Sequence, residues 1–495
     1  MDSTKQGHPK GLYTLFATEM WERFSYYGMR ALFTLYLTAK LADDGFGLPR
    51  EEALALYAVF TGLVYLTPIL GGWVADKFLG KRKTVYIGGI VMAVGQFLLA
   101  ASAFMATSLD APTRLFLFNF GLGVLIIGNG FFKPNISTIV GDFYDDNDPR
   151  KDSAFNIFYM GINLGAILGP FIAGALGENI HWGWGFLSAG LGMILSVLWL
   201  KWKEDTLEQY GLPPGSPESK YLLDAKDWRD IFMYAIGLVV ATFVVIKVWG
   251  MLPESITTIL TYGGFAAIIL GLGYVIAKGT NGAHEWSRML VIIVLAFFNI
   301  AFWAGFEQAG GTMNLFAKEN TNRMLGGWEI PASWFQNINP LAILIFAPIF
   351  SVMWLKLDKM KLNPRTPLKF AIGLFLGAFA FLIMTWASNA ADGGHMVSPF
   401  WLVAVYVILT LGELMLSPIG LSMITKLAPT KLVSVVMGLW MASFAAGNYL
   451  AGMLESILHK YDFPLYPFIM WVMIGSGVCL LILSPFLNKA MKGIH

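Results

Sequence analysis

Residues 19–28 read Glu-Met-Trp-Glu-Arg-Phe-Ser-Tyr-Tyr-Gly and lie within one hydrophobic segment, 11–40. Glu19, Glu22 and Arg23 therefore fall at membrane depth, where each charge costs at least about 2.5–3.5 kcal/mol to insert. Their spacing of three and four residues places them on one stripe of a helix. Such a stripe must face protein or water, and we interpret it as part of a substrate or ion pathway. A structural ion-pair network between helices is the alternative interpretation.

The composition of the whole chain agrees with a membrane environment. The 495 residues are 56% hydrophobic and only 13% charged, and the mean hydropathy is +0.61. Soluble chains average about 25% charged residues. Most of the surface must therefore face lipid, which excludes a cytosolic enzyme, a secreted disulfide scaffold and a disordered chain. The net charge of +2 argues against nucleic acid as a partner, and the single Cys479 supports neither a disulfide framework nor a metal site.

Uncharged runs of about 20 residues, the length with which a helix crosses the hydrocarbon core, recur along the chain. They cover residues 54–75, 86–109, 153–177, 182–200, 255–277, 330–355, 370–391, 432–454 and 463–488. Three further runs, 115–132, 289–306 and 396–412, each end at a single charge. With segments 11–40 and 231–250, the pattern predicts about fourteen membrane-spanning helices. Strands are not expected, because lipid permits only helices or closed barrels, and barrels show short alternating segments.

The longest polar stretch, about 201–229, contains three prolines within residues 213–217 and is interpreted as a cytoplasmic linker. Six predicted spans precede it and eight follow it. The loops at 72–83 and 356–365 occupy equivalent places in the two halves, and both are rich in Lys and Arg. Two six-span halves are typical of transporters. The predicted parts are an N-terminal six-helix bundle at 1–202, a linker with two extra helices at 203–285 and a C-terminal six-helix bundle at 286–495.

The orientation follows from Lys and Arg, which gather in cytoplasmic loops. We place the N-terminus in the cytoplasm and let successive loops alternate between the two sides of the membrane. Of the 34 Lys and Arg, 24 then lie inside, 7 lie outside and 3 lie within spans. This asymmetry predicts a multi-pass protein of the cytoplasmic membrane with both termini in the cytoplasm.

Ionisable side chains at membrane depth are the candidate functional residues. They are Glu19, Glu22, Arg23, Arg30, Lys133, Glu307 and Glu413. Fully ionised, they carry three positive and four negative charges, which predicts mutual pairing around one buried polar cavity. The carboxylate in excess could hold a proton. None of the six histidines falls within a predicted span, so carboxylates must carry any coupled proton.

The stretch at 19–28 resembles the ExxERFxYYG motif of the proton-dependent oligopeptide transporters, a family of the major facilitator superfamily. Further segments resemble the family's other motifs in the same order along the chain. They are residues 65–76, 130–138, 158–166, 306–308, 336–340, 412–418 and 438–448. The resemblance covers nearly the whole chain, and the two extra spans resemble those of prokaryotic members.

The resemblance implies an all-α integral membrane protein with the major facilitator fold. It further implies a proton-coupled symporter, not an enzyme, that imports di- and tripeptides into a prokaryotic cell by alternating access. Protons are the coupling ion, and no other cofactor is implied. The expected partners are peptides, protons and the lipid bilayer, with no nucleic acid, and the chain is expected to act as a monomer.

The residue roles are carried over from matching motif positions. Those implied in proton coupling are Glu19, Glu22, Arg23 and Glu307. Those implied in peptide binding are Arg23, Tyr27, Arg30, Tyr65, Lys133, Asn163, Trp303, Asn339, Glu413 and Trp440. Salt bridges among Arg30, Lys133, Glu307 and Glu413 are implied to gate access. No metal ligands are implied. Animal relatives carry a histidine where this chain has Ala58, so coupling cannot use that residue here.

Two other functions remain open from the sequence. A relative of the family could carry another anion or zwitterion, such as nitrate or an amino-acid conjugate, and a membrane sensor or scaffold could bind peptide without moving it. The intact ExxER motif and Glu413 favour coupled transport of a substrate that bears an amine. An ATP-driven pump is excluded for this chain, because no GxxxxGK[ST] loop occurs.

Overall fold

The computed structural model describes residues 7–145, 148, 150–213, 215–217 and 221–491, so Pro214 of the predicted linker and both chain ends lie outside it. The helices of the first half are α1 (Lys10–Thr38), α2 (Arg50–Val74), α3 (Lys81–Phe104), α4 (Ala111–Asp142), α5 (Arg150–Asn179), α6 (Trp182–Trp202) and α7 (Ala225–Met251). Those that follow are α8 (Glu254–Gly279), α9 (Gly282–Phe306), α10 (Thr312–Glu319), α11 (Ile338–Lys359), α12 (Thr366–Ala391), α13 (Phe400–Leu427), α14 (Val433–His459) and α15 (Leu465–Ala490).

Fourteen of the helices in the described residues have 21 residues or more. The described part of the chain holds twelve spans that are long and apolar enough to cross a membrane. The two long helices outside that set are α1, which carries the charged stripe, and α8. Even α6, with 21 residues, measures about 32 Å at about 1.5 Å per residue, which matches a hydrocarbon core of about 30 Å. The prediction of an all-helical membrane protein is confirmed.

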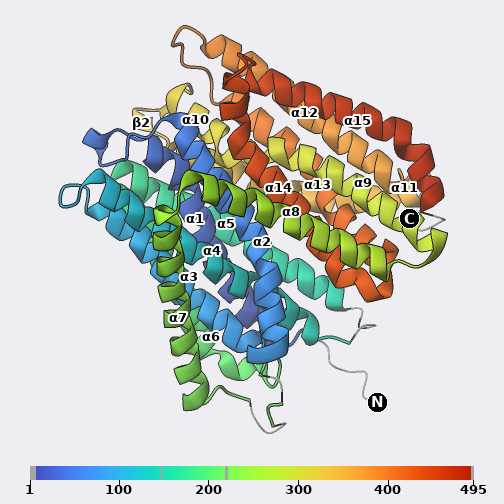
Figure 1. Ribbon diagram of the computed structural model, residues 1–495. Coiled ribbons are helices and arrows are strands. Elements are labelled where there is room, and N and C mark those ends of the chain that lie inside the picture. Colours follow the sequence, from blue (N-terminus) through green and yellow to red (C-terminus); the bar gives the residue numbers. More distant parts are fainter. Residues whose placement is uncertain (1–6, 146–147, 149, 214, 218–220, 492–495) are drawn as a thin grey trace. The chain divides into compact units, whose positions relative to one another are not determined.

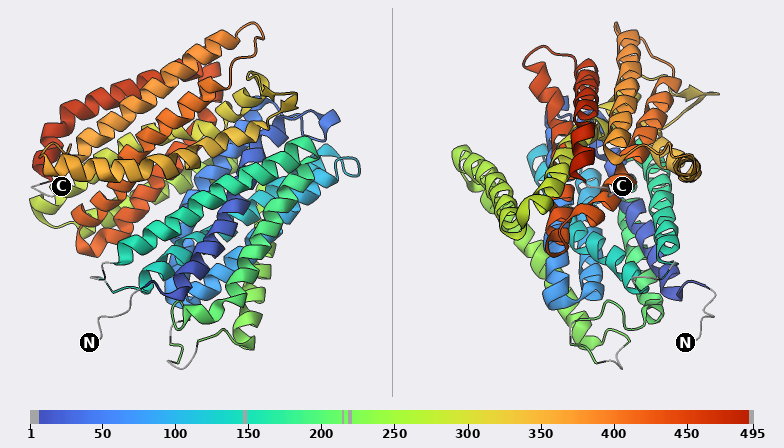
Figure 2. Two further views of the ribbon diagram at one scale, coloured as in Figure 1. Left: turned by 180° about the vertical axis from the view of Figure 1, so that it is seen from behind. Right: turned by 90° about the vertical axis from the view of Figure 1, so that its right-hand side faces the viewer.

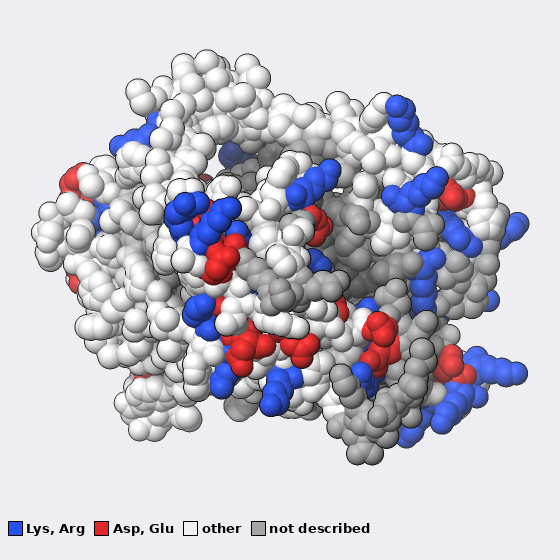
Figure 3. All heavy atoms as spheres, turned by 90° about the horizontal axis from the view of Figure 1, so that it is seen from below, with Lys and Arg blue, Asp and Glu red and all other residues white. Residues whose placement is uncertain are grey.

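Short elements connect the long helices. A π-helical turn (Ala75–Leu79) extends α2, and 3-10 turns stand at Leu41–Asp43, Glu204–Leu207, Glu307–Gly310, Ala332–Asn337 and Thr430–Leu432. One antiparallel ribbon, β1 (Met324–Leu325) and β2 (Trp328–Glu329), lies between α10 and α11. The strands among the described residues therefore lie in a connection between helices. This agrees with the rule that an open strand cannot cross the hydrocarbon core. Figure 3 shows a face on which charged side chains of both signs gather, while wide parts of that view carry none.

The chain divides into two compact units, each a bundle of long helices (Figures 1 and 2). Unit one comprises Met1–Pro49 and Leu63–Lys247, and unit two comprises Arg50–Gly62 and Val248–His495. The helix α2 is therefore shared, because its first half belongs to unit two. The predicted boundaries at residues 202 and 285 stay a prediction.

Close packing between α1 and α5 fixes the charged stripe in unit one. A Cβ on Gly165 would lie 2.2 Å from the carbonyl oxygen of Met20 and 2.8 Å from the Cβ of Arg23. Only glycine allows the two backbones to approach this closely. The same contact recurs one turn further along α5, where Gly169 meets the backbone of Phe24. The glycines of α5 therefore position the backbone of α1 that carries Arg23.

Two helices continue past the charges that end their apolar runs in the sequence. The run at 115–132 stops at Lys133, but α4 continues to Asp142. The run at 396–412 stops at Glu413, but α13 continues to Leu427. Both charges therefore lie inside long helices, because a helix that faces protein or water can carry a polar residue at membrane depth.

The linker after α6 is anchored on a buried arginine. Arg82 is fully buried, and its guanidinium donates hydrogen bonds to the carbonyl oxygens of Glu208 (2.8 Å), Tyr210 (2.6 Å) and Tyr221 (2.7 Å). Its Nη1 also lies 3.7 Å from a carboxylate oxygen of the buried Glu204. Gly80, two residues before Arg82, has φ +75°, and a Cβ there would lie 2.6 Å from Pro213. The basic loop at 72–83 thus holds the linker as well as contributing positive charge.

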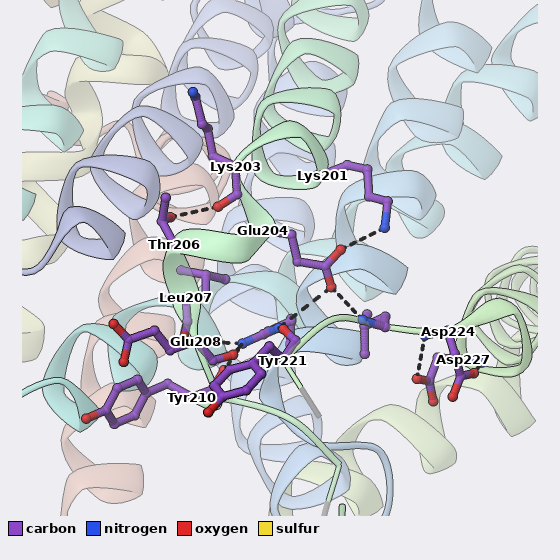
Figure 4. A network of polar contacts seen from close by, with 12 residues as sticks. Lys201, Lys203, Glu204, Thr206, Leu207, Glu208, Tyr210, Tyr221, Asp224 and Asp227 are labelled. Carbon is purple, nitrogen blue, oxygen red and sulfur yellow. Dashed lines mark hydrogen bonds and ion pairs between the residues drawn. The ribbon is translucent and has the colours of Figure 1, made fainter. Parts of the chain in front are cut away.

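The same network fixes the start of α7 (Figure 4). Glu204 accepts hydrogen bonds from Lys201 at 2.7 Å and from the backbone N–H of Leu223 at 3.0 Å. Asp224 and Asp227 each accept a hydrogen bond from the other's backbone N–H, at 3.0 Å in both cases, which caps the first turn of α7.

We expect Gly165→Ala to destabilise the protein by about 1–3 kcal/mol, because the added methyl group would force α1 and α5 apart. The measurement is the thermal unfolding midpoint of the purified protein in detergent. Gly237→Ala in α7 is the matched control, since no atom lies within 4 Å of its added Cβ, and alanine favours a helix. Equal midpoints for the two variants would contradict the close-packing explanation.

Candidate functional site

A buried ion-pair cluster occupies the middle of α1. The Nε of Arg23 lies 3.1 Å from Glu19 Oε1 and also pairs with Glu22, and Arg23 Nη2 donates to Glu22 Oε1 at 2.7 Å. All three residues are at least 97% buried. Asn129 of α4 donates to Glu22 Oε1 at 3.2 Å. The stripe predicted from the spacing thus forms one cluster inside unit one.

The cluster carries one more carboxylate than cation. Glu19 Oε2 is buried, and it has no hydrogen-bond partner among the residues that the structure describes. Uncompensated charge is costly in such a place. One proton on Glu19 would turn the unpartnered oxygen into a hydrogen-bond donor, and Lys133 nearby also attracts this carboxylate when it is charged. The geometry therefore suits a site that takes up and releases a proton.

Aromatic rings and further cations surround the cluster. The Arg23 guanidinium lies 5.3 Å from the ring centre of Tyr26 and 6.0 Å from that of Tyr27, and Arg30 lies 5.8 Å from Tyr27. Lys133 Nζ lies 4.6 Å from the ring centre of Tyr65. These distances are within the range of cation–π attraction.

Lys133 of α4 is close enough to attract the Glu19 carboxylate, so it belongs to the same charged region of unit one. Asn163 of α5 is buried and donates to the carbonyl oxygen of Tyr159 in its own helix at 2.9 Å. Tyr27, Arg30, Tyr65 and Lys133 keep part of their surface exposed. Unit one therefore presents three cations beside phenol rings.

Unit two holds a separate acidic region. Asn339 of α11 donates hydrogen bonds to Glu413 Oε2 and to Thr410 Oγ1, both at 2.9 Å. Glu307 is buried just after α9 and lies close enough to Glu413 for the two carboxylates to repel each other. The structure thus brings Glu307, Asn339 and Glu413 together within unit two.

The two tryptophans differ in their surroundings. Trp303 Nε1 donates to Asn299 at 3.1 Å, and its ring centre lies 4.7 Å from that of Phe444. Trp440 is fully buried, with its ring centre 6.3 Å from that of Phe444. Within the described residues its Nε1 has no hydrogen-bond partner.

The sequence analysis missed three polar residues of these regions, namely Asn129, Asn299 and Thr410. Each lies within a predicted apolar run and carries no charge, so a search for ionisable residues passes over it. The spacing could have revealed two of them. Asn129 precedes Lys133 by four residues, and Asn299 precedes Trp303 by four residues, so each pair lies one helical turn apart on the same face.

Comparison with known proteins identifies the family. The model of the POT family matches residues 82–216 and 276–470. The chain belongs to the POT family. The Yersinia enterocolitica peptide transporter YePEPT is 38% identical over 455 residues, which are 90% of this chain and 88% of that protein. A di-/tripeptide transporter of Lactococcus lactis is 34% identical over 509 residues, covering 100% of this chain and 99% of that one.

Solved structures agree with this assignment. A crystal structure of the peptide transporter POT in complex with sulfate has a TM-score of 0.84 and 35% sequence identity, covering 99% of this chain and 97% of the other. A POT family transporter in complex with a thioalcohol-conjugated peptide has a TM-score of 0.82 and 32% identity, covering 98% of each chain. The expected major facilitator fold and family are therefore confirmed, and so is the expectation that the protein is a transporter and not an enzyme.

Removing the cation from the α1 cluster should destabilise the protein strongly. In Arg23→Leu, Glu19 and Glu22 lose their shared partner, and we expect a loss of about 3–5 kcal/mol, typical of breaking a buried pair. The measurement is thermal unfolding in detergent. Replacing both glutamates with glutamine in the same variant removes the unpaired charges and should restore at least half of the loss. No recovery would show that Arg23 acts through packing rather than charge.

Proposed function

We propose that this POT-family protein imports di- and tripeptides together with protons by alternating access, as a monomer of the cytoplasmic membrane with both termini inside. The observation that carries the proposal is the buried cluster of Arg23 with Glu19 and Glu22 in a chain of this family. A proton bound by this cluster would be the coupling ion, and Glu307 would be a further group that binds and releases it. Twelve spans among the described residues and bacterial relatives support the membrane location.

A peptide is a zwitterion with a fixed backbone and variable side chains. The cations of unit one, Arg23, Arg30 and Lys133, suit its carboxylate. In unit two, Glu413 and Asn339 suit its amino group. We assign the walls around the peptide's side chains to aromatic and amide groups. Such groups accept many different peptide side chains without specific hydrogen bonds. They are Tyr27, Tyr65, Asn163, Trp303 and Trp440.

Gating would use the same charged groups when no peptide is bound. We assign the gating salt bridges to Arg30 and Lys133 as cations and to Glu307 and Glu413 as carboxylates. A peptide whose end groups replace the partners in these salt bridges would couple its own binding to the conformational cycle that alternating access requires. One proton that crosses about 100 mV inward releases about 2.3 kcal/mol. This free energy supports about fiftyfold accumulation of a neutral zwitterion.

A second candidate substrate has the same two end groups. A solved POT family structure with 32% identity and a TM-score of 0.82 holds 5-aminolevulinic acid, which also bears an amine and a carboxylate. Competition against a labelled dipeptide would separate the two. Stronger competition by 5-aminolevulinic acid than by dialanine would make the amino acid the better substrate.

The first test is uptake by the purified protein in liposomes. With an inward proton gradient we expect labelled dialanine to accumulate above its outside concentration, and a protonophore should abolish the accumulation. Facilitated uptake that stops at equal concentrations would contradict proton coupling. An absence of uptake, with exchange of another ligand confirming active protein, would contradict the peptide assignment.

Glu22→Gln should separate transport from coupling. The variant keeps the shape of the side chain but cannot ionise, so we expect no proton-driven accumulation, while exchange of labelled for unlabelled peptide continues. Glu52→Gln, at an exposed carboxylate in the first turn of α2, is the control and should behave like the wild type. Uphill uptake by Glu22→Gln would remove Glu22 from the coupling mechanism.

A further inference from the structure

A cavity of about 430 Å³ lies in unit two among α11, α12 and α13, with Met491 at one side. Small-molecule sites occupy about 300–1,000 Å³. Its walls include none of the residues assigned above to peptide, proton or gating. The proposed transport cycle therefore leaves this cavity without a role.

One end of the cavity is built for an anion. Lys369 and Lys426 line it, together with the hydroxyl groups of Ser351 and Ser422. Thr366, the first residue of α12, lines it as well, so the N-terminal end of a 26-residue helix borders the same space. Helix N-termini favour phosphate and other anions. Two ammonium groups and a helix end thus converge on one place.

The surroundings of this end carry more cations than carboxylates. Asp358 attracts Lys369, and Lys426 repels it more weakly. Lys369 Nζ also lies 4.1 Å from the ring centre of Trp354, another lining residue. The adjoining loop, 356–365, carries four cations and Asp358, a net charge of +3. A bound anion would relieve this repulsion.

The other end of the cavity is apolar. Ala347 and Phe350 of α11 line it together with Leu414 and Ile419 of α13. From Leu414 to Lys426 the lining runs along twelve residues of α13, about 18 Å at about 1.5 Å per residue. A soluble phosphate would occupy only the charged end. A phospholipid presents a phosphate and an acyl chain in the same order as the two ends of the cavity.

We propose that this cavity binds one acidic glycerophospholipid of the cytoplasmic leaflet. Lys369 and Lys426 hold the phosphate beside the first residue of α12, and an acyl chain lies along the apolar wall of α11 and α13. The excess of Lys and Arg in the loop at 356–365 assigns this end to the cytoplasmic side. Basic pockets on that side of membrane proteins suit anionic headgroups.

Binding can be measured directly on the purified full-length protein. Titration with phosphatidylglycerol in detergent, followed by native mass spectrometry, should show one retained lipid and a preference over phosphatidylcholine. Lys369→Gln/Lys426→Gln should weaken phosphatidylglycerol binding about thirtyfold. Lys226→Gln/Lys278→Gln, which removes two exposed lysines outside the cavity, is the charge-matched control and should bind as the wild type does.

A second variant tests the apolar end. Ala347→Phe should fill the cavity and weaken phosphatidylglycerol binding without changing any charge, and thermal unfolding checks that each variant is folded. Equal binding of the two lipids, or unchanged binding by the double lysine variant, would overturn the proposal. If inorganic phosphate displaces phosphatidylglycerol and binds Ala347→Phe as tightly as the wild type, the site serves a soluble anion, and the lipid assignment is wrong.

Discussion

Charge that must be buried at membrane depth is the constraint on which this structure depends. Arg23 stands between Glu19 and Glu22, and each group reduces the cost of burying the others. The arrangement needs α1 at a fixed distance from its neighbours, which the glycines of α5 allow. It also needs a polar partner from α4, which Asn129 supplies. The packing of unit one and the pairing of its buried charges therefore depend on the same contacts.

Much of the fold could be predicted because apolar length is a direct consequence of bilayer thickness. The spans and the polar linker follow from that rule, and the charged stripe of α1 follows from the spacing of its residues on a helix. The ends of α4 and α13 could not be predicted in this way. A run of apolar residues ends at Lys133 or Glu413, but the helix continues wherever its polar face meets protein or water.

The sequence singles out residues for the candidate site but not the contacts between them. Ionisable residues in spans stand out in the sequence, whereas Thr410 beside Asn339 does not, because one sequence carries no record of which helices touch. The same limit applies to Arg82. Its place in a basic loop suggests topology alone, and only the structure shows the linker carbonyls around it.

The buried Arg82 also sets an order for folding. Its hydrogen-bond acceptors, Glu208, Tyr210 and Tyr221, are synthesised more than 120 residues later, after helices α1 to α6. Until the ribosome has released that linker, the guanidinium lacks the carbonyl groups that compensate its burial. The close packing around the Arg82 guanidinium can therefore form only after residue 221 has been synthesised.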